Sequence, residues 1–140
     1  MERPLIVLDT ITIDCREEDI PDMIRFYAQL TGFEPEVYKG ETMPTLLGKS
    51  IAISFFPVNH YDAPTFPSPA VGRQIHLDLY VTDLPAAIEF ARSIGAKDSS
   101  RQFHPSYHIM LDPAGHPFCL TTNGPTVKNV QDDSPSLIDE

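Results

Sequence analysis

The sequence predicts an α+β fold made of two similar strand–helix–strand–strand–strand (βαβββ) modules. Three observations lead to this prediction. A segment of about twenty residues occurs twice, each copy has the pattern of a strand followed by a helix, and short strand-like runs follow each helix. The chain has 140 residues, close to the size of one ordinary domain, and its 41% hydrophobic content is sufficient for a core.

The internal repeat is the strongest of these observations. The first copy runs from Ile11 to Gly32 and the second from Ile75 to Gly95, with one extra residue before Gly32. The matched pairs include two aspartates, a hydrophobic residue followed by proline, and a phenylalanine: Asp14 with Asp78, Asp19 with Asp83, Ile20-Pro21 with Leu84-Pro85, and Phe26 with Phe90. Chance is a poor explanation for this many matches in one register.

Each copy begins with a predicted strand and continues as a predicted helix. The strands are expected at Ile11–Cys15 and Ile75–Val81, where β-branched and apolar residues alternate. Asp19 and Asp83 are expected to cap the two helices, each followed by a proline near the first helical position, where no amide hydrogen is needed. Apolar residues at helical spacing follow, and the glycine that closes each copy is expected to end the helix.

The rest of each half divides into short predicted strands: Glu36–Tyr38, Thr45–Leu47 and Ile51–Phe56, then Lys97–Phe103, Tyr107–Leu111 and Phe118–Thr122. Asp112–Gly115 predicts a tight turn, because aspartate opens such turns and glycine tolerates positive φ. We therefore expect a single domain over residues 1–122. Its modules lie at about 9–60 and 74–122, with a proline-rich linker at 61–73, and a polar, disordered tail follows at 123–140.

Charge and composition exclude several classes of function. Ten basic against twenty acidic residues give a net charge of −10, which disfavours nucleic acids and anionic membrane surfaces as partners. No apolar run reaches the roughly eighteen residues of a membrane span, and the N-terminus lacks the features of a signal peptide. We therefore expect a cytoplasmic protein, with Cys15 and Cys119 as free thiols.

Several segments resemble the vicinal-oxygen-chelate superfamily, which includes glyoxalase I, extradiol dioxygenases and bleomycin-resistance proteins. They are IDC and RFYAQLTGFEPE in the first half, and IHLDLYVTDLPAAIEFARSIGA and DPAGHPFCL in the second. The last two resemble the glyoxalase-like subfamily. The resemblance covers about residues 10–122 and implies that the two modules form a curved mixed sheet around a cavity. It does not fix the chemistry, since one fold carries many functions.

The resemblance also implies where a metal would be held. Active members use four ligands, usually histidine and glutamate, one from the first and one from the last strand of each half. In this sequence those positions fall on Thr12, on Ser54 or Phe56, on His76 and on Cys119. Of these only His76 is a typical ligand, and the set suits Fe, Mn or Ni poorly. We therefore expect the usual metal site to be lost and no firm cofactor; a divalent metal held through His76 is the alternative.

Strand alternation predicts which side chains line the cavity. If His76 faces it, so do Asp78 and Tyr80, while the apolar residues between them turn towards the helices. The remaining predicted lining and ligand-binding residues are Thr12, Asp14, Phe56, Tyr107, Cys119 and Thr121.

His76 and Asp78 form the candidate catalytic pair. A carboxylate beside an imidazole can fix its tautomer and raise its pKa, which suits a general base. The competing interpretation is structural: the aspartates bond backbone amides, and His76 is a satisfied core residue. Cys119 as a nucleophile has no base that the sequence identifies.

Three functions are compatible with this reading. The first is a small-molecule-binding protein with a degenerate metal site, forming a homodimer that completes the cavities, as the resemblance implies. The alternative is a lyase, isomerase or dioxygenase, either metal-dependent through His76 with Asp78, Asp14 or Cys119, or metal-free through His76 and Asp78. The third is a partner-binding module whose cavity is vestigial. Stoichiometric metal after purification would separate the first from the second.

Overall fold

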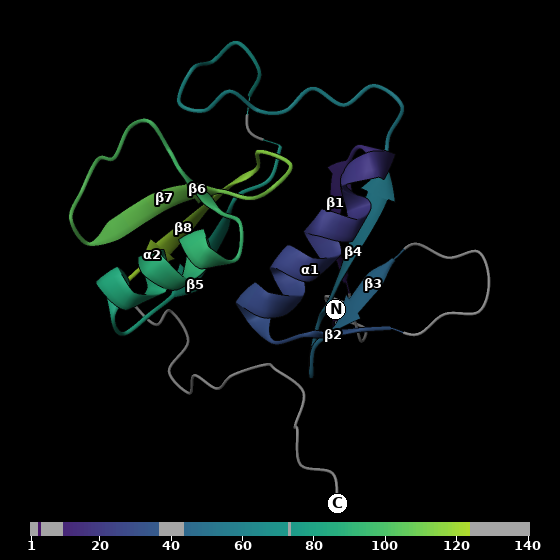
Figure 1. The fold of residues 1–140 in the computed structure, drawn as a ribbon, viewed down its shortest axis with the longest axis horizontal. Helices are drawn as coiled ribbons and strands as arrows, with labels where there is room; N and C mark the ends of the chain where they lie inside the picture. Colours follow the sequence, from purple (N-terminus) through teal and green to yellow (C-terminus); the bar gives the residue numbers. More distant parts are fainter. Residues whose placement is uncertain (1–2, 4–9, 37–43, 73, 124–140) are drawn as a thin grey trace, which may run out of the picture.

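The two halves of the chain repeat the same order of elements in the computed structural model, which describes residues 3, 10–36, 44–72 and 74–123 (Figure 1). The first half contains β1 (Thr10–Cys15), the 3-10 turn η1 (Glu17–Asp19), α1 (Ile20–Thr31), β2 (Glu34–Pro35), β3 (Thr45–Leu47) and β4 (Ala52–Pro57). The second contains β5 (Leu77–Tyr80), α2 (Leu84–Ser93), β6 (Lys97–Asp98), β7 (Tyr107–Leu111) and β8 (Pro117–Thr121). The predicted α+β class and the βαβββ order are confirmed.

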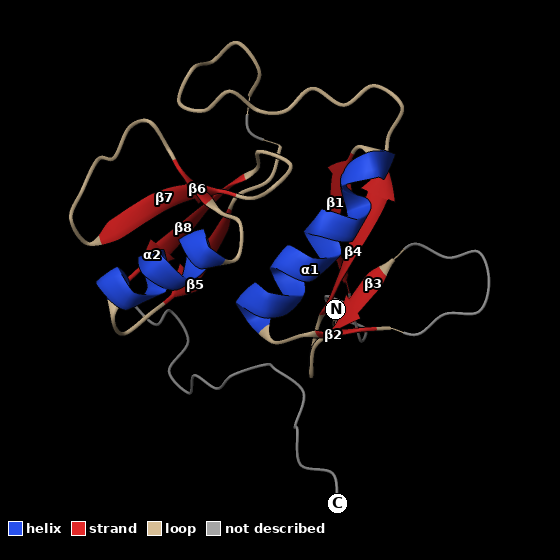
Figure 2. Cartoon of the chain, viewed as in Figure 1, coloured by secondary structure: helices blue, strands red, loops and turns tan. Residues whose placement is uncertain are grey.

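Each half forms its own four-stranded mixed sheet, in the orders β1-β4-β3-β2 and β5-β8-β7-β6. The first and last strands of each half pair in parallel, and the other pairs are antiparallel. The helix of each half lies on one face of its sheet (Figure 2). We call the opposite face the open face. By strand alternation it carries Thr12, Asp14 and Phe56 in the first sheet and Asp78, Tyr80 and Cys119 in the second.

Two predicted strands of the second half are shorter than expected. β5 begins at Leu77, so His76 immediately precedes the strand. β6 ends at Asp98, although the Ser99 amide still donates to the Ile109 carbonyl at 3.0 Å, and further pairing with β7 comes from the side chain of Gln102. Its Oε1 accepts a hydrogen bond from the Ile109 amide at 2.7 Å, and its Nε2 donates to the Ile109 carbonyl at 2.8 Å. In the first half, β2 lies at Glu34–Pro35 rather than Glu36–Tyr38, and residues 37–43 lie outside the described ranges.

The two helix N-termini differ although their sequences match. Asp83 caps α2 as predicted, its Oδ1 accepting a hydrogen bond from the Ala86 amide at 3.1 Å. The predicted capping by Asp19 is wrong: η1 precedes α1, and the Asp19 carboxylate instead accepts a hydrogen bond from Arg16 at 3.0 Å. At the other end of α1, Gly32 adopts the predicted left-handed conformation with φ of 79°. Within the described ranges, no helix is long and apolar enough to cross a membrane. The predicted tail at 123–140 lies, after Asn123, outside those ranges.

Helix α1 contacts the second half of the chain through Phe26 and Tyr27. Its buried residues are Met23, Phe26 and Tyr27. The Phe26 ring lies 5.8 Å from that of Phe118 on β8, and the Tyr27 ring lies 5.8 Å from that of Phe55 on β4. Helix α2 packs mainly on β7 and β8 of its own half. The repeat-matched phenylalanines therefore differ: Phe26 is 1% exposed, and Phe90 is 49% exposed.

A chain of buried hydrogen bonds, here called the Tyr27–Asp112–His116 link, ties the two halves together. The Tyr27 hydroxyl donates to Asp112 Oδ2 at 2.7 Å, and Asp112 Oδ1 accepts from the Ala114 and His116 amides at 2.9 Å each. His116 Nε2 donates to the Asp14 carbonyl at 2.8 Å. Burial raises the pKa of the Asp112 carboxyl, while His116 and the three donors act in the opposite direction. The predicted Asp112–Gly115 turn is confirmed, with a Gly115 φ of 93°.

Replacing Tyr27 with phenylalanine removes one of the three donors to a buried carboxylate. We expect Tyr27→Phe to lower the free energy of unfolding by about 1–3 kcal/mol, measured by urea denaturation. Tyr80→Phe is the matched control, because Tyr80 is 41% exposed, and its effect should stay within about 0.5 kcal/mol. Equal losses in the two variants would show that the link does not stabilise the fold.

Alkaline pH should destabilise the protein through buried thiol and phenol groups. Burial and nearby acidic groups raise the pKa of Cys15 from 9.0 to about 11, and burial likewise raises the pKa of Tyr27 and Tyr61. The unfolded chain thus releases these protons first. The stability linked to Cys15 is complete below pH 9.0 and is lost as pH rises to about 11, at roughly 1.4 kcal/mol per unit. Urea unfolding at several pH values should therefore show a smaller alkaline loss for Cys15→Ala than for wild type. Identical losses would contradict this assignment.

Candidate functional site

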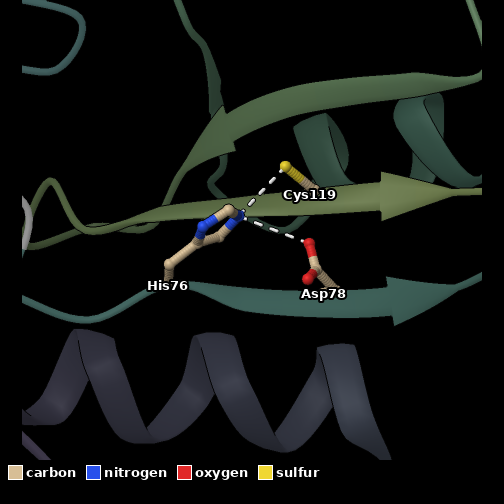
Figure 3. A group of neighbouring side chains, drawn as sticks. All are labelled: His76, Asp78 and Cys119. Carbon is tan, nitrogen blue, oxygen red and sulfur yellow. Dashed lines mark hydrogen bonds and ion pairs between the residues drawn. The ribbon is translucent and has the colours of Figure 1, made fainter.

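Three side chains meet on the open face of the second sheet. His76 Nε2 lies 3.2 Å from Cys119 Sγ and 3.3 Å from Asp78 Oδ1 (Figure 3). The donor atoms of the three residues all lie within 4.8 Å of one another. His76 immediately precedes β5, Asp78 lies on β5, and Cys119 lies on β8. We call this group the His76–Asp78–Cys119 cluster.

The sequence places the cluster through simple alternation. Leu77 and Leu79 of β5, and Leu120 of β8, pack into the core, so the residues between them face the other way. The parallel pairing of β5 with β8 puts Asp78 directly opposite Cys119. His76 extends the same alternation by one position, and its ring points towards both residues (Figure 3).

The cluster is open to solvent on one side. The side chains of His76 and Asp78 are 37% and 69% exposed, whereas Cys119 is only 6% exposed. A single imidazole nitrogen faces both the thiol and the carboxylate, and it can carry no more than one hydrogen. No base for Cys119 could be identified from the sequence alone. The structure puts His76 beside it through the β5–β8 pairing, which joins residues 43 positions apart.

Among the described residues of the first half, the positions that match the cluster do not form a similar group. Asp14 is the repeat counterpart of Asp78, and it pairs with Phe56 as Asp78 pairs with Cys119. The register therefore makes Phe56, and not Ser54, the counterpart of Cys119. Ser54 is buried, with its hydroxyl 2.9 Å from that of Thr45. Thr12 is exposed on the same open face.

The remaining predicted residues are adjacent in the sheet register. Tyr80 and Thr121 pair with each other across β5 and β8, next to the cluster. Tyr107 pairs with Thr121 across β7 and β8, and its ring stacks on that of His104, with centroids 6.1 Å apart. One residue that the sequence reasoning missed is Leu47, which is 42% exposed on the open face of β3. Its alternation with the buried Leu46 could have indicated this position.

Two surface hollows lie outside the cluster. One of about 430 Å³ is lined by polar residues of the η1 region and the start of the linker, including Arg16, His60 and Tyr61. The other, of about 450 Å³, lies between α2 and the loop before β7, and Tyr107 lines it together with Leu84. Tyr107 is the only residue of the predicted cavity lining found in either of these hollows.

The four-ligand metal centre that the resemblance implies does not fit these residues. Its two positions in the first half are Thr12 and Phe56, neither of which offers an imidazole or carboxylate. His76 and Cys119 hold the two positions in the second half, and Asp78 adds a carboxylate beside them. The imidazole nitrogen, carboxylate oxygen and thiol sulfur of this group therefore all come from the second half of the chain.

Comparison with protein families shows to which family this chain is related. The family described as "Glyoxalase-like domain" matches residues 10–121, which include both halves. The chain belongs to the glyoxalase-like family. No protein of curated function matches this glyoxalase-like sequence.

Solved structures of other proteins share the glyoxalase-like fold at low sequence identity. A glyoxalase-related enzyme from Fulvimarina pelagi has a TM-score of 0.57 and 17% identity, covering 84% of this chain and 88% of its own. TnmS3, an antibiotic binding protein from Streptomyces sp. CB03234, has a TM-score of 0.58 and 13% identity, covering 86% and 98%. A glyoxalase family protein from Enterococcus faecalis has a TM-score of 0.56 and 20% identity, covering 84% and 96%. At these identities the likeness concerns the fold alone.

Proposed function

We propose that this glyoxalase-like protein binds a small planar organic molecule on the open faces of its sheets. The observation that carries the proposal is the composition of those faces. Phe56 is 46% exposed and lies opposite the exposed Asp14 of the neighbouring strand, and Tyr80 is 41% exposed and lies two residues after the exposed Asp78 on the same strand. Aromatic rings with a few polar groups are the usual lining of small-molecule sites.

The acidic groups define the chemical class of the ligand. Asp14 lies opposite Phe56, and Asp78 lies two residues before Tyr80, so each ring has a carboxylate neighbour. A flat ring favours aromatic and cationic partners, and a carboxylate favours hydrogen-bond donors. The net charge of −10 also attracts cations over anions. The preferred ligand is therefore an aromatic molecule that carries an amine or other donor group.

A second copy of the chain closes the binding cavity in this proposal. Leu47, Phe56 and Tyr80 are 42%, 46% and 41% exposed on the open faces of a single chain. Burial of such large apolar side chains on association is favourable. Two copies that meet through these faces would bury these side chains and enclose a ligand between them. TnmS3, an antibiotic binding protein with the same fold, supports binding of an organic ligand as the use of this fold.

The ligand proposal is tested with naphthylmethylammonium and naphthoate, which share one ring system and differ in charge. Titration calorimetry is run with a chelator present, so that metal plays no part. We expect the ammonium to bind more tightly by about tenfold, since a charge contact at a partly exposed site is worth about 1 kcal/mol or more.

The matched variants are Phe56→Ala and Phe90→Ala. Phe56 and Phe90 have similar exposures, 46% and 49%, but Phe90 lies on α2, away from the open faces. Phe56→Ala should weaken ammonium binding by about tenfold through the lost ring contact, and Phe90→Ala should leave it unchanged. Equal affinities in the two variants, or tighter binding of naphthoate, would refute the proposal.

A further inference from the structure

One surface hollow contains none of the residues that carry the proposed function. It lies between α2 and the loop before β7, has a volume of about 450 Å³, and is here called the α2 hollow. We propose that the α2 hollow binds a flat, neutral heteroaromatic molecule that carries one hydrogen-bond donor and one acceptor. This goes beyond the proposed function, because the lining residues and the class of ligand both differ from those of the open faces.

The walls of the α2 hollow suit a flat apolar body. Leu84 and Ile88 come from α2, and Phe103, which is 52% exposed, comes from the loop before β7. The ring of His104 lies nearly parallel to that of Tyr107, with an interplanar angle of 10°. A volume of about 450 Å³ is within the range of small-molecule sites, which are lined mainly by apolar and aromatic groups with a few polar atoms.

His104 supplies a hydrogen-bond donor to the hollow. Its Nδ1 accepts a hydrogen bond from the Ser106 backbone amide at 3.1 Å, so in the neutral ring the hydrogen lies on Nε2. Within the described ranges no other residue bonds this Nε2. The imidazole therefore presents one fixed N–H donor, and its stacking on Tyr107 holds the plane of the ring.

His108 supplies an acceptor. Its Nε2 lies 2.6 Å from Asp98 Oδ1, and Arg92 donates to both oxygens of the same carboxylate at 2.9 and 3.1 Å. Hydrogen bonds from Arg92 and His108 lower the pKa of the Asp98 carboxyl, so this group is ionised and can only accept. The hydrogen of the neutral His108 ring therefore lies on Nε2, and Nδ1 is left as an acceptor.

This pair of histidines defines the chemical class of the ligand. A ligand that lacks the complementary donor or acceptor displaces water from a histidine nitrogen without replacing its hydrogen bond, which lowers affinity. The nearby charges are already paired, since Arg92 bonds Asp98 and the Arg101 guanidinium lies 5.5 Å above the centre of the Phe103 ring. A charged group on the ligand would therefore find no partner, and the ligand is neutral.

Benzimidazole is the probe that tests this site, because its two ring nitrogens supply one donor and one acceptor. N-methylbenzimidazole lacks the donor, and indole lacks the acceptor. The three probes are titrated into the full-length chain by NMR at about pH 8.5, where imidazole is ordinarily neutral. We expect benzimidazole to bind about fivefold more tightly than either analogue. Nitrogen–proton correlation spectra of the imidazole rings should show the hydrogen on Nε2 in both His104 and His108.

Phe103→Ala and Phe90→Ala are the matched variants, because the two rings are 52% and 49% exposed and only Phe103 lines the hollow. Phe103→Ala should weaken benzimidazole binding by about tenfold, and Phe90→Ala should leave it unchanged. His104→Phe keeps a flat ring beside Tyr107 but removes the N–H donor. In that variant the preference for benzimidazole over indole should disappear.

Equal affinities for the three probes in the wild-type chain, or equal affinities of Phe103→Ala and Phe90→Ala for benzimidazole, would overturn the proposal. Loss of benzimidazole binding in Phe56→Ala would assign the probe to the open faces and would overturn it as well. The proposed function is tested separately, since it concerns the effect of Phe56→Ala on the ammonium ligand. Urea unfolding curves show that each variant compared is folded.

Discussion

The hydrogen bond from Tyr27 to Asp112 is the contact on which the arrangement of the two halves depends. It joins α1 of the first half to the turn before β8 of the second, and both groups are almost completely buried. Through the His116 amide and ring the same chain of bonds reaches the Asp14 carbonyl on β1. A buried carboxylate is tolerated only where its donors are in place, so this link restricts how the halves can pack. Each helix covers one face of its own sheet, and the opposite face of each sheet is the open face.

The two copies of the repeat carry different side chains at matching positions of their open faces. The repeat gives both halves the same register, so Asp14 faces Phe56 and Asp78 faces Cys119. Substitutions at equivalent positions then separate the halves chemically. The first sheet presents a ring and a hydroxyl, and the second presents the His76–Asp78–Cys119 cluster. The helices diverge in the same way, since Phe26 is buried between the halves while Phe90 stays exposed.

Features set by local sequence could be predicted, and features set by distant pairing could not. The alternation of β5, the Asp83 cap and the Asp112–Gly115 turn each depend on a few adjacent residues. The choice of Phe56 over Ser54 required the β1–β4 register, and the contact of His76 with Cys119 required the β5–β8 pairing. The Asp19 cap is absent because Arg16, which has Tyr80 at the matching position of the second copy, gives the Asp19 carboxylate another partner. Likewise, a strand pattern does not reveal that the Gln102 side chain bonds the Ile109 backbone of β7 beyond the end of β6.

The open faces of the two sheets are proposed to bind the ligand and to be covered by a second copy of the chain. The most direct measurement is hydroxyl-radical footprinting of the wild-type chain over a dilution series, comparing its three most exposed described phenylalanines. Phe56, Phe90 and Phe103 are 46%, 49% and 52% exposed in a single chain, so in an isolated chain they should react at similar rates. At high protein concentration we expect Phe56 to be the one phenylalanine of the three that becomes protected, and Tyr80 to become protected with it. Dilution should restore the reactivity of both. If Phe56 reacts as fast as Phe90 and Phe103 at every concentration, no second copy closes over the open faces, and the proposed binding surface is wrong.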